Sequence, residues 1–115
     1  MNFDWEKFIE LAEKLNQQES EEAFRTAVSR AYYSVFCTLR NLKGFKDYTK
    51  GSIHYKVIDS LKQSQDKTDQ LIGQMLDSLR KKRNNADYNG DISVDEKFSH
   101  RSIVEAREIF KYLNK

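Results

Sequence analysis

The chain has 115 residues, of which 33% are charged and 38% hydrophobic, and it contains no proline. This length predicts one domain over residues 1–115, and the missing proline removes the main breaker of helices. No apolar run is long enough to cross a membrane, and the N-terminal residues lack the basic start and apolar stretch of a signal peptide, so we expect a cytoplasmic protein without membrane contact.

The net charge is only +2, but the charges are unevenly distributed. Residues 1–24 hold seven acidic and two basic side chains, whereas residues 25–83 hold five acidic and thirteen basic ones. This pattern permits a polyanionic partner without requiring one, and a solvated helix surface is the alternative explanation. The single cysteine, Cys37, lies in an apolar helical stretch, so we expect a buried, inert thiol.

Helical periodicity begins at the N-terminus and predicts a first helix near residues 3–16. Ser20 is a good N-cap for a long second helix because two acidic residues follow it in the first turn. This helix is expected to end at Lys43–Gly44, a basic last turn followed by glycine. Its predicted apolar face comprises Phe24, Ala27, Val28, Ala31, Val35, Leu39 and Leu42.

After a loop over residues 44–51, Ser52 can cap a third helix whose apolar residues are Ile53, Val57, Ile58 and Leu61. A polar linker over residues 63–67 leads to a fourth helix, for which Thr68 can serve as N-cap. The predicted apolar side of the fourth helix comprises Leu71, Ile72, Met75, Leu76, Leu79 and Ala86.

The turn-forming Asn89-Gly90-Asp91 ends the fourth helix. Ser93 and Glu96 have the spacing of a capping box for a last helix, which extends to Leu113. No convincing strand signal occurs. Short links between long amphipathic helices predict an all-α, antiparallel up-and-down bundle of four to five helices.

One charged residue lies on an apolar face. Leu76, Leu79, Arg83 and Ala86 follow a three-four spacing, so Arg83 should face the core. A guanidinium there is costly unless it is paired or opened to a cleft. Asp87, one turn later, could pair with it. The pattern therefore leaves two interpretations open: an ion pair that closes the end of the bundle, or an arginine that binds an anion.

Two further polar features border apolar faces. Arg30 and Tyr33 lie three residues apart on the second helix, where Arg30 could reach the rim of the core and hydrogen-bond Tyr33. His54 shares a face with Ile58 and Leu61 and is expected to be a hydrogen-bonded core or interface residue. Its place just after an N-cap should disfavour protonation.

Familiar catalytic and metal-binding sets are missing from the sequence. There is no glycine-rich phosphate loop. The two histidines and one cysteine lack zinc-ligand spacing, and no Glu-x-x-His pair is present. We therefore expect neither a metal nor another cofactor.

Three segments, Ser29–Phe36, Ser52–His54 and Arg80–Tyr88, together resemble the sequence pattern of HEPN-domain proteins. These proteins are small helical bundles, and many of them are metal-independent ribonucleases. Their motif is an arginine, a polar residue and a histidine, and two copies meet across a dimer interface. Carried over by position, the resemblance assigns the first two roles to Arg83 and Asn84, whereas Tyr88 replaces the histidine.

The resemblance implies a homodimer that acts on RNA or a nucleotide. Small chains of this family often act beside a nucleotidyltransferase, as toxin and antitoxin, or in phage defence. A phenol with a pKa of about 10 is a poor general base at neutral pH. We therefore expect a binding module with Arg83, Asn84 and Tyr88 at its centre. The other expected binding residues are Arg30, Tyr33, His54, Arg80 and Asp87.

Two alternatives remain. The first is an active, metal-independent endoribonuclease toxin in which Arg83 stabilises charge on the scissile phosphate and Tyr88 or His54 transfers protons. The second is a purely structural dimerisation bundle in which Arg83 and Asp87 only close the core.

Overall fold

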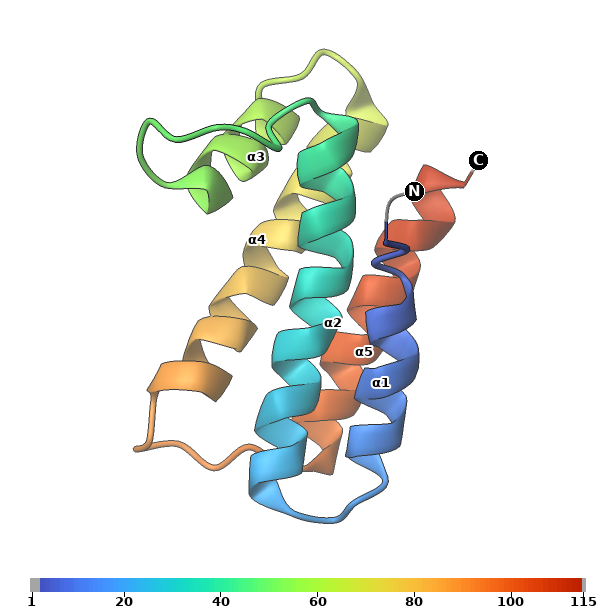
Figure 1. The fold of residues 1–115 in the computed structure, drawn as a ribbon, viewed down its shortest axis with the longest axis vertical. Helices are drawn as coiled ribbons and strands as arrows, with labels where there is room; N and C mark the ends of the chain where they lie inside the picture. The colour runs from blue at the N-terminus through green and yellow to red at the C-terminus, as the bar shows by residue number, and fades with distance from the viewer. Residues whose placement is uncertain (1–2, 115) are drawn as a thin grey trace.

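The computed structural model describes residues 3–114, and these form five α-helices with no strand among them (Figure 1). The helices are α1 (Lys7–Asn16), α2 (Glu21–Leu42), α3 (Ile53–Lys62), α4 (Lys67–Tyr88) and α5 (Glu96–Leu113). The four helices other than α3 run alternately up and down, and α2 packs against each of the others. The predicted all-α antiparallel bundle is therefore confirmed.

Two of the predicted N-caps are confirmed. The Ser20 hydroxyl accepts a hydrogen bond from the Ala23 backbone N–H at 3.3 Å, and the Ser52 hydroxyl accepts one from the Tyr55 N–H at 3.2 Å. Ser52 thus caps α3 two residues before His54, so that histidine lies in the first turn of the helix.

The other two predicted N-caps are wrong. Asp66, not Thr68, caps α4, and its carboxylate accepts the Thr68 N–H at 2.9 Å. Aspartate caps at least as well as threonine, so the helix starts earlier. Asp95, not Ser93, caps α5 and accepts the Phe98 N–H at 2.9 Å, whereas the intervening Val94 is buried and its N–H is bound to Glu21 of α2.

The first helix begins at Lys7, four residues later than predicted. The chain before it forms a turn in which the Asp4 carboxylate accepts the Glu6 N–H at 3.1 Å. Phe3 and Trp5 still join an aromatic cluster with Phe8, with ring centroids 4.9 to 5.6 Å apart. The apolar residues before Lys7 therefore pack against the first helix without being part of it.

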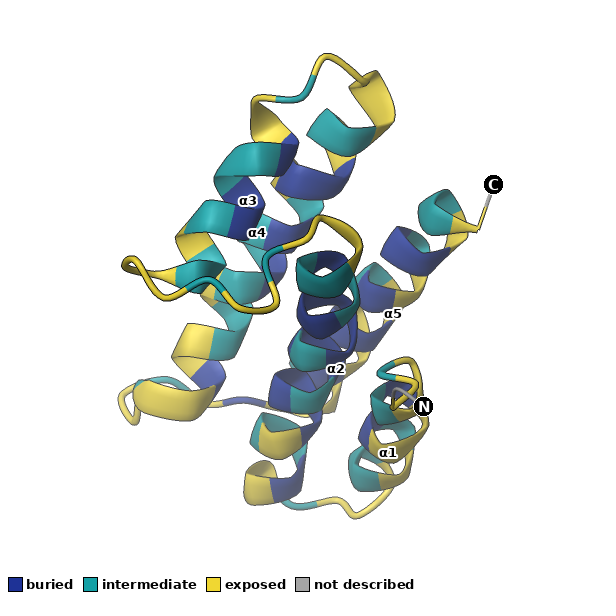
Figure 2. Ribbon diagram, turned by 45° about the horizontal axis from the view of Figure 1, so that its top comes forward, coloured by how far each residue is buried: buried dark blue, intermediate teal, exposed yellow. Residues whose placement is uncertain are grey.

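The core is made of apolar side chains from all five helices, and its buried positions on α2 face the other helices (Figure 2). Cys37 is buried as predicted, and burial raises the pKa of its thiol. Leu42 and Leu71 were predicted on apolar faces but are 65% and 38% exposed. Both lie near helix ends, where the period continues but no neighbouring helix covers it.

None of the helices in the described chain combines the length and apolar character that a membrane crossing would need.

Candidate functional site

Arg83 lies at the centre of a polar cluster where α4 faces α2. Its Nε donates to the Asp87 carboxylate at 2.9 Å and its Nη1 to the Asn84 side-chain oxygen at 3.0 Å. Its Nη2 donates to the Tyr33 hydroxyl at 2.7 Å and the Tyr88 hydroxyl at 3.3 Å. The Arg83 side chain is only 11% exposed. The predicted pairing with Asp87 is therefore present, at the end of the bundle.

Tyrosine rings surround the same guanidinium. Its central carbon lies 5.7 Å from the ring centroid of Tyr32, 5.1 Å from that of Tyr33 and 5.4 Å from that of Tyr88. Each distance is within the range in which a ring face attracts a cation. Tyr32 is fully buried, whereas Tyr88 is 75% exposed. We call the cluster around Arg83, with Tyr33, Asn84, Asp87 and Tyr88, the arginine site. Tyr88 forms its solvent-facing wall.

His54 reaches this cluster from α3. Its Nδ1 lies 2.6 Å from the Tyr32 hydroxyl, and its ring stacks on Phe36 with centroids 4.2 Å apart. Burial, together with the positive charges of Arg80 and Arg83, lowers the pKa of His54 to about 4. The sequence predicted a hydrogen-bonded histidine with disfavoured protonation, but these causes differ from the predicted helix terminus.

The protonation of the His54–Tyr32 pair follows from burial. Burial raises the pKa of the Tyr32 phenol well above its ordinary value, so this hydroxyl stays protonated at neutral pH. His54 Nδ1 is its one hydrogen-bond partner within residues 3–114. A buried hydroxyl rarely leaves its proton unpaired, so Tyr32 donates to Nδ1. The imidazole proton is then on Nε2, where His54 is a donor.

Arg80 is a second arginine of the site, one turn before Arg83. Its Nε is buried and has no hydrogen-bond partner within the described chain. Its positive charge helps to lower the pKa of His54 and partly offsets the rise that burial causes in the pKa of Tyr32. Two guanidiniums therefore share this region with one directly bound carboxylate, that of Asp87. The local charge is positive, which suits an anionic ligand.

Arg30 extends the cluster toward α1. Its guanidinium carbon lies 4.8 Å from the Phe8 ring centroid and 5.3 Å from that of Tyr33. The Arg30–Tyr33 hydrogen bond considered from the sequence is replaced, because the Tyr33 hydroxyl accepts from Arg83. Tyr33 thus contacts two arginines, and Arg30 is connected to Arg83 only through this ring.

All eight residues singled out from the sequence gather in one region. Five are in direct contact, Arg80 and His54 are adjacent, and Arg30 lies beyond Tyr33. Sequence reasoning missed Tyr32 and Phe36, although both lie in the segment Ser29–Phe36 that carries the family resemblance. Apolar spacing alone could not distinguish these two rings from ordinary core residues.

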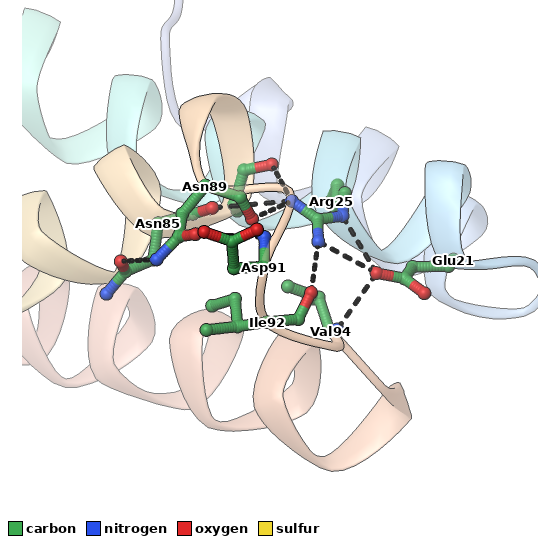
Figure 3. A network of polar contacts seen from close by, with 8 residues as sticks. Glu21, Arg25, Asn85, Asn89, Asp91, Ile92 and Val94 are labelled. Atoms are coloured by element: carbon green, nitrogen blue, oxygen red, sulfur yellow. Dashed lines mark hydrogen bonds and ion pairs between the residues drawn. The ribbon is translucent and has the colours of Figure 1, made fainter.

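Sequence reasoning also missed Arg25, which holds the end of α4 (Figure 3). Its Nη1 donates to the backbone oxygens of Ala86 and Asn89, both at 3.0 Å, and lies 3.4 Å from that of Asn85. Its Nη2 donates to the Ile92 oxygen at 2.6 Å. The last carbonyls of a helix have no partner within the helix, and a cation there also offsets the helix dipole.

Glu21 completes this contact. Its carboxylate accepts from Arg25 Nε at 2.9 Å and from the Val94 N–H at 3.1 Å (Figure 3). The backbone bond to Val94, followed by the bond to Arg25, lowers the pKa of Glu21. Together, Glu21 and Arg25 attach the start of α2 to the last turn of α4. That turn carries Asp87 and Tyr88, so the pair positions two members of the arginine site.

Replacing Arg25 with methionine should lower the free energy of unfolding by about 2 kcal/mol, because it leaves the last α4 carbonyls without their charged donor. Urea denaturation followed by circular dichroism measures the change. Arg101→Met is the matched control, since Arg101 is exposed on α5. Equal destabilisation by both substitutions would contradict this role for Arg25.

The arginine site is open to solvent at Tyr88, whose side chain is 75% exposed. A hollow of about 490 Å³ lies between α1 and α5, lined among others by Ile9, Arg107 and Phe110, and no residue of the arginine site borders it. Within residues 3–114, no cluster of three or more His, Cys, Asp or Glu side chains could hold a metal ion. The polar side chains of the arginine site itself are those of its arginines, its tyrosines, Asn84, Asp87 and His54.

The chain is similar to an uncharacterized protein, MJ0992, of Methanocaldococcus jannaschii. The two are 29% identical, and the match covers 90% of this chain and 68% of that protein. No family model matches the chain, and no solved structure matches it. The comparisons therefore assign neither a family nor an activity, and the functional inference rests on the geometry of the site.

Proposed function

We propose that this protein is a HEPN-like module that binds the phosphate groups of RNA at Arg83 and Arg80. The observation that carries the proposal is the pair of arginines one turn apart on α4, of which Arg83 is nearly buried and Arg80 has a buried Nε without a partner in residues 3–114. Only one carboxylate, Asp87, pairs directly with them. A phosphodiester would supply the missing negative charge.

The neighbours of the arginines suit RNA. The exposed ring of Tyr88 can stack on a base, and stacking is how proteins commonly hold single-stranded nucleic acid. The Nε2 proton of His54 can donate to a phosphate oxygen or a ribose hydroxyl. Asn84 is exposed and already oriented by Arg83, so its amide can donate to the same ligand.

Homodimerisation is part of this proposal. Tyr88 at the end of α4 and Tyr55 on α3 are 75% and 64% exposed, which is high for large aromatic side chains. A second copy placed over the open arginine site would cover such rings and bring a second pair of arginines to the same ligand. We propose a cytoplasmic role beside a nucleotidyltransferase partner, in a toxin–antitoxin or defence system.

The test is binding of a fluorescein-labelled, single-stranded RNA of about 12 nucleotides, followed by anisotropy. Arg83→Met should raise the dissociation constant at least about tenfold, because it removes a charged phosphate donor from the centre of the site. Arg101→Met, which removes one positive charge from the surface of α5, should change it little. Unchanged affinity of a folded Arg83→Met variant would refute the site.

One observation favours a second candidate function, a metal-independent ribonuclease. The motif position of the histidine is occupied by Tyr88, but His54 brings an imidazole within 6.0 Å of the Tyr33 ring, and Tyr33 binds Arg83. This candidate predicts cleavage of RNA in the presence of a chelator, with 2′,3′-cyclic phosphate ends. His54→Gln should abolish the cleavage, whereas His100→Gln should leave it unchanged.

A further inference from the structure

A second basic feature lies on a different face of α4. A hollow of about 420 Å³ is bordered by Lys62 from α3 and by Lys81 and Lys82 from α4. We call it the lysine groove. Ser78 and Asn85 add polar side chains to its wall, and Asp77 is the one carboxylate in its lining. The groove accounts for the two lysines between Arg80 and Arg83, which the arginine site does not use.

Positive charge exceeds negative charge in this lining. Asp77 is shared by two lysines, with its carboxylate 2.8 Å from Lys62 Nζ and 3.7 Å from Lys81 Nζ. Lys82 pairs with Glu105 of α5 at 3.2 Å. An ammonium group has three donors, so each lysine keeps protons for a further acceptor. Lys81 is 75% exposed and Lys62 is 39% exposed, so both can reach a ligand.

We propose that the lysine groove binds the phosphate backbone of the same RNA strand, beyond the arginine site. This inference rests on the proposed function. Successive residues of a helix are separated by about 100° around its axis, so Lys82 and Arg83 face adjacent sectors of α4. A strand that crosses the C-terminal half of α4 therefore meets both features. Lysine ammonium groups contact phosphates without reading bases, so the groove adds affinity rather than sequence preference.

The experiment uses the same labelled RNA and the full chain, titrated over a range of salt concentrations. The test variant combines Lys62→Gln, Lys81→Gln and Lys82→Gln. The control variant combines Lys7→Gln, Lys14→Gln and Lys111→Gln, which remove the same charge from α1 and the end of α5. A third variant, with arginine at the three groove positions, keeps the charge.

The groove variant should bind about tenfold more weakly at low salt, and its slope of log affinity against log salt should be shallower by about 2, since three phosphate contacts are lost. The control variant should keep the wild-type slope, and so should the arginine variant. Equal losses in the groove and control variants would overturn the groove as a contact and leave only a general effect of net charge.

The outcomes separate the groove from the arginine site. If Arg83→Met weakens binding and the groove variant does not, the groove inference fails while the proposed function stands. If only the groove variant weakens binding, the groove is supported and the assignment of Arg83 fails. If folded wild-type protein does not bind the RNA, both fail.

Discussion

Replacing Gly73 with valine is expected to lower the free energy of unfolding by about 3 kcal/mol, because the α3–α4 interface has no room for a side chain there. A Cβ at Gly73 would lie 3.0 Å from the Leu61 Cβ and 3.1 Å from the Lys62 backbone nitrogen. The Lys62 nitrogen belongs to the α3 backbone, and the Leu61 Cβ is bonded directly to it. No rotamer change can move them away, so α3 itself would have to shift.

The helix propensity of valine makes this test sharper. Valine is a better helix former than glycine, so an effect of α4 alone would be stabilising. Gly90→Ala is the matched control, because a Cβ there would meet nothing within 4 Å and should leave stability unchanged or slightly higher. Urea denaturation of both variants measures the difference. A Gly73→Val variant as stable as wild type would mean that α3 and α4 do not pack this closely.

The consequence of Gly73 reaches the arginine site. α3 carries His54, and α4 carries Arg80 and Arg83. The close approach at Gly73 therefore sets how near the imidazole lies to the two guanidiniums. A shift of α3 should weaken the His54–Tyr32 hydrogen bond, which NMR of the histidine ring nitrogens would detect.

The helices could be predicted from the sequence because apolar spacing and N-cap residues are local signals. Ser20 and Ser52 each precede an amphipathic run, and both cap a helix as predicted. Thr68 failed because Asp66, two residues earlier, is an equally good cap and only the packed structure decides between them. Ser93 failed because the next residue, Val94, is buried and gives its N–H to Glu21 of α2, so the helix starts after it.

The candidate site was only partly predictable, for a similar reason. Asn84, Asp87 and Tyr88 lie one, four and five residues after Arg83, so their contacts with it follow from helical spacing. The Arg83–Tyr33 hydrogen bond joins residues fifty positions apart, and no spacing rule predicts it. The segments that carry the family resemblance include both Arg83 and Tyr33, but they do not indicate that the two side chains are in contact.

Arg25 gave no signal in the sequence. Its partners are backbone oxygens of α4 and of the connection to α5, and a backbone oxygen has no residue type to recognise. In the sequence it is an ordinary basic residue near the polar N-terminal end of the second helix. Only the packing of α2 against α4 gives it a role, which is why its effect on stability is a prediction from structure alone.

Protonation of His54 is expected to cost about 2 kcal/mol of stability as the pH falls from about 6.5 toward 4, after allowance for its partial exposure. Burial and the two arginines lower its pKa to about 4 in the folded chain, against 6.5 for an ordinary histidine. Between these values the unfolded chain binds a proton that the folded chain does not. The free energy of unfolding therefore decreases as the pH decreases through this window. Above the window, His54 has no effect on it.

Urea denaturation at several pH values between about 4.5 and 7 would measure this effect. His54→Gln should remove most of the fall, whereas His100→Gln, at an exposed position of α5, should keep it. Glu21 and Asp77, whose pKa values are lowered, lose their contribution to stability only as the pH falls below the ordinary carboxylate range, and they do so in every variant. Identical pH profiles for wild type and His54→Gln would mean that the imidazole is not held against the arginines. Phosphate binding by Arg80 and Arg83 would not depend on the result.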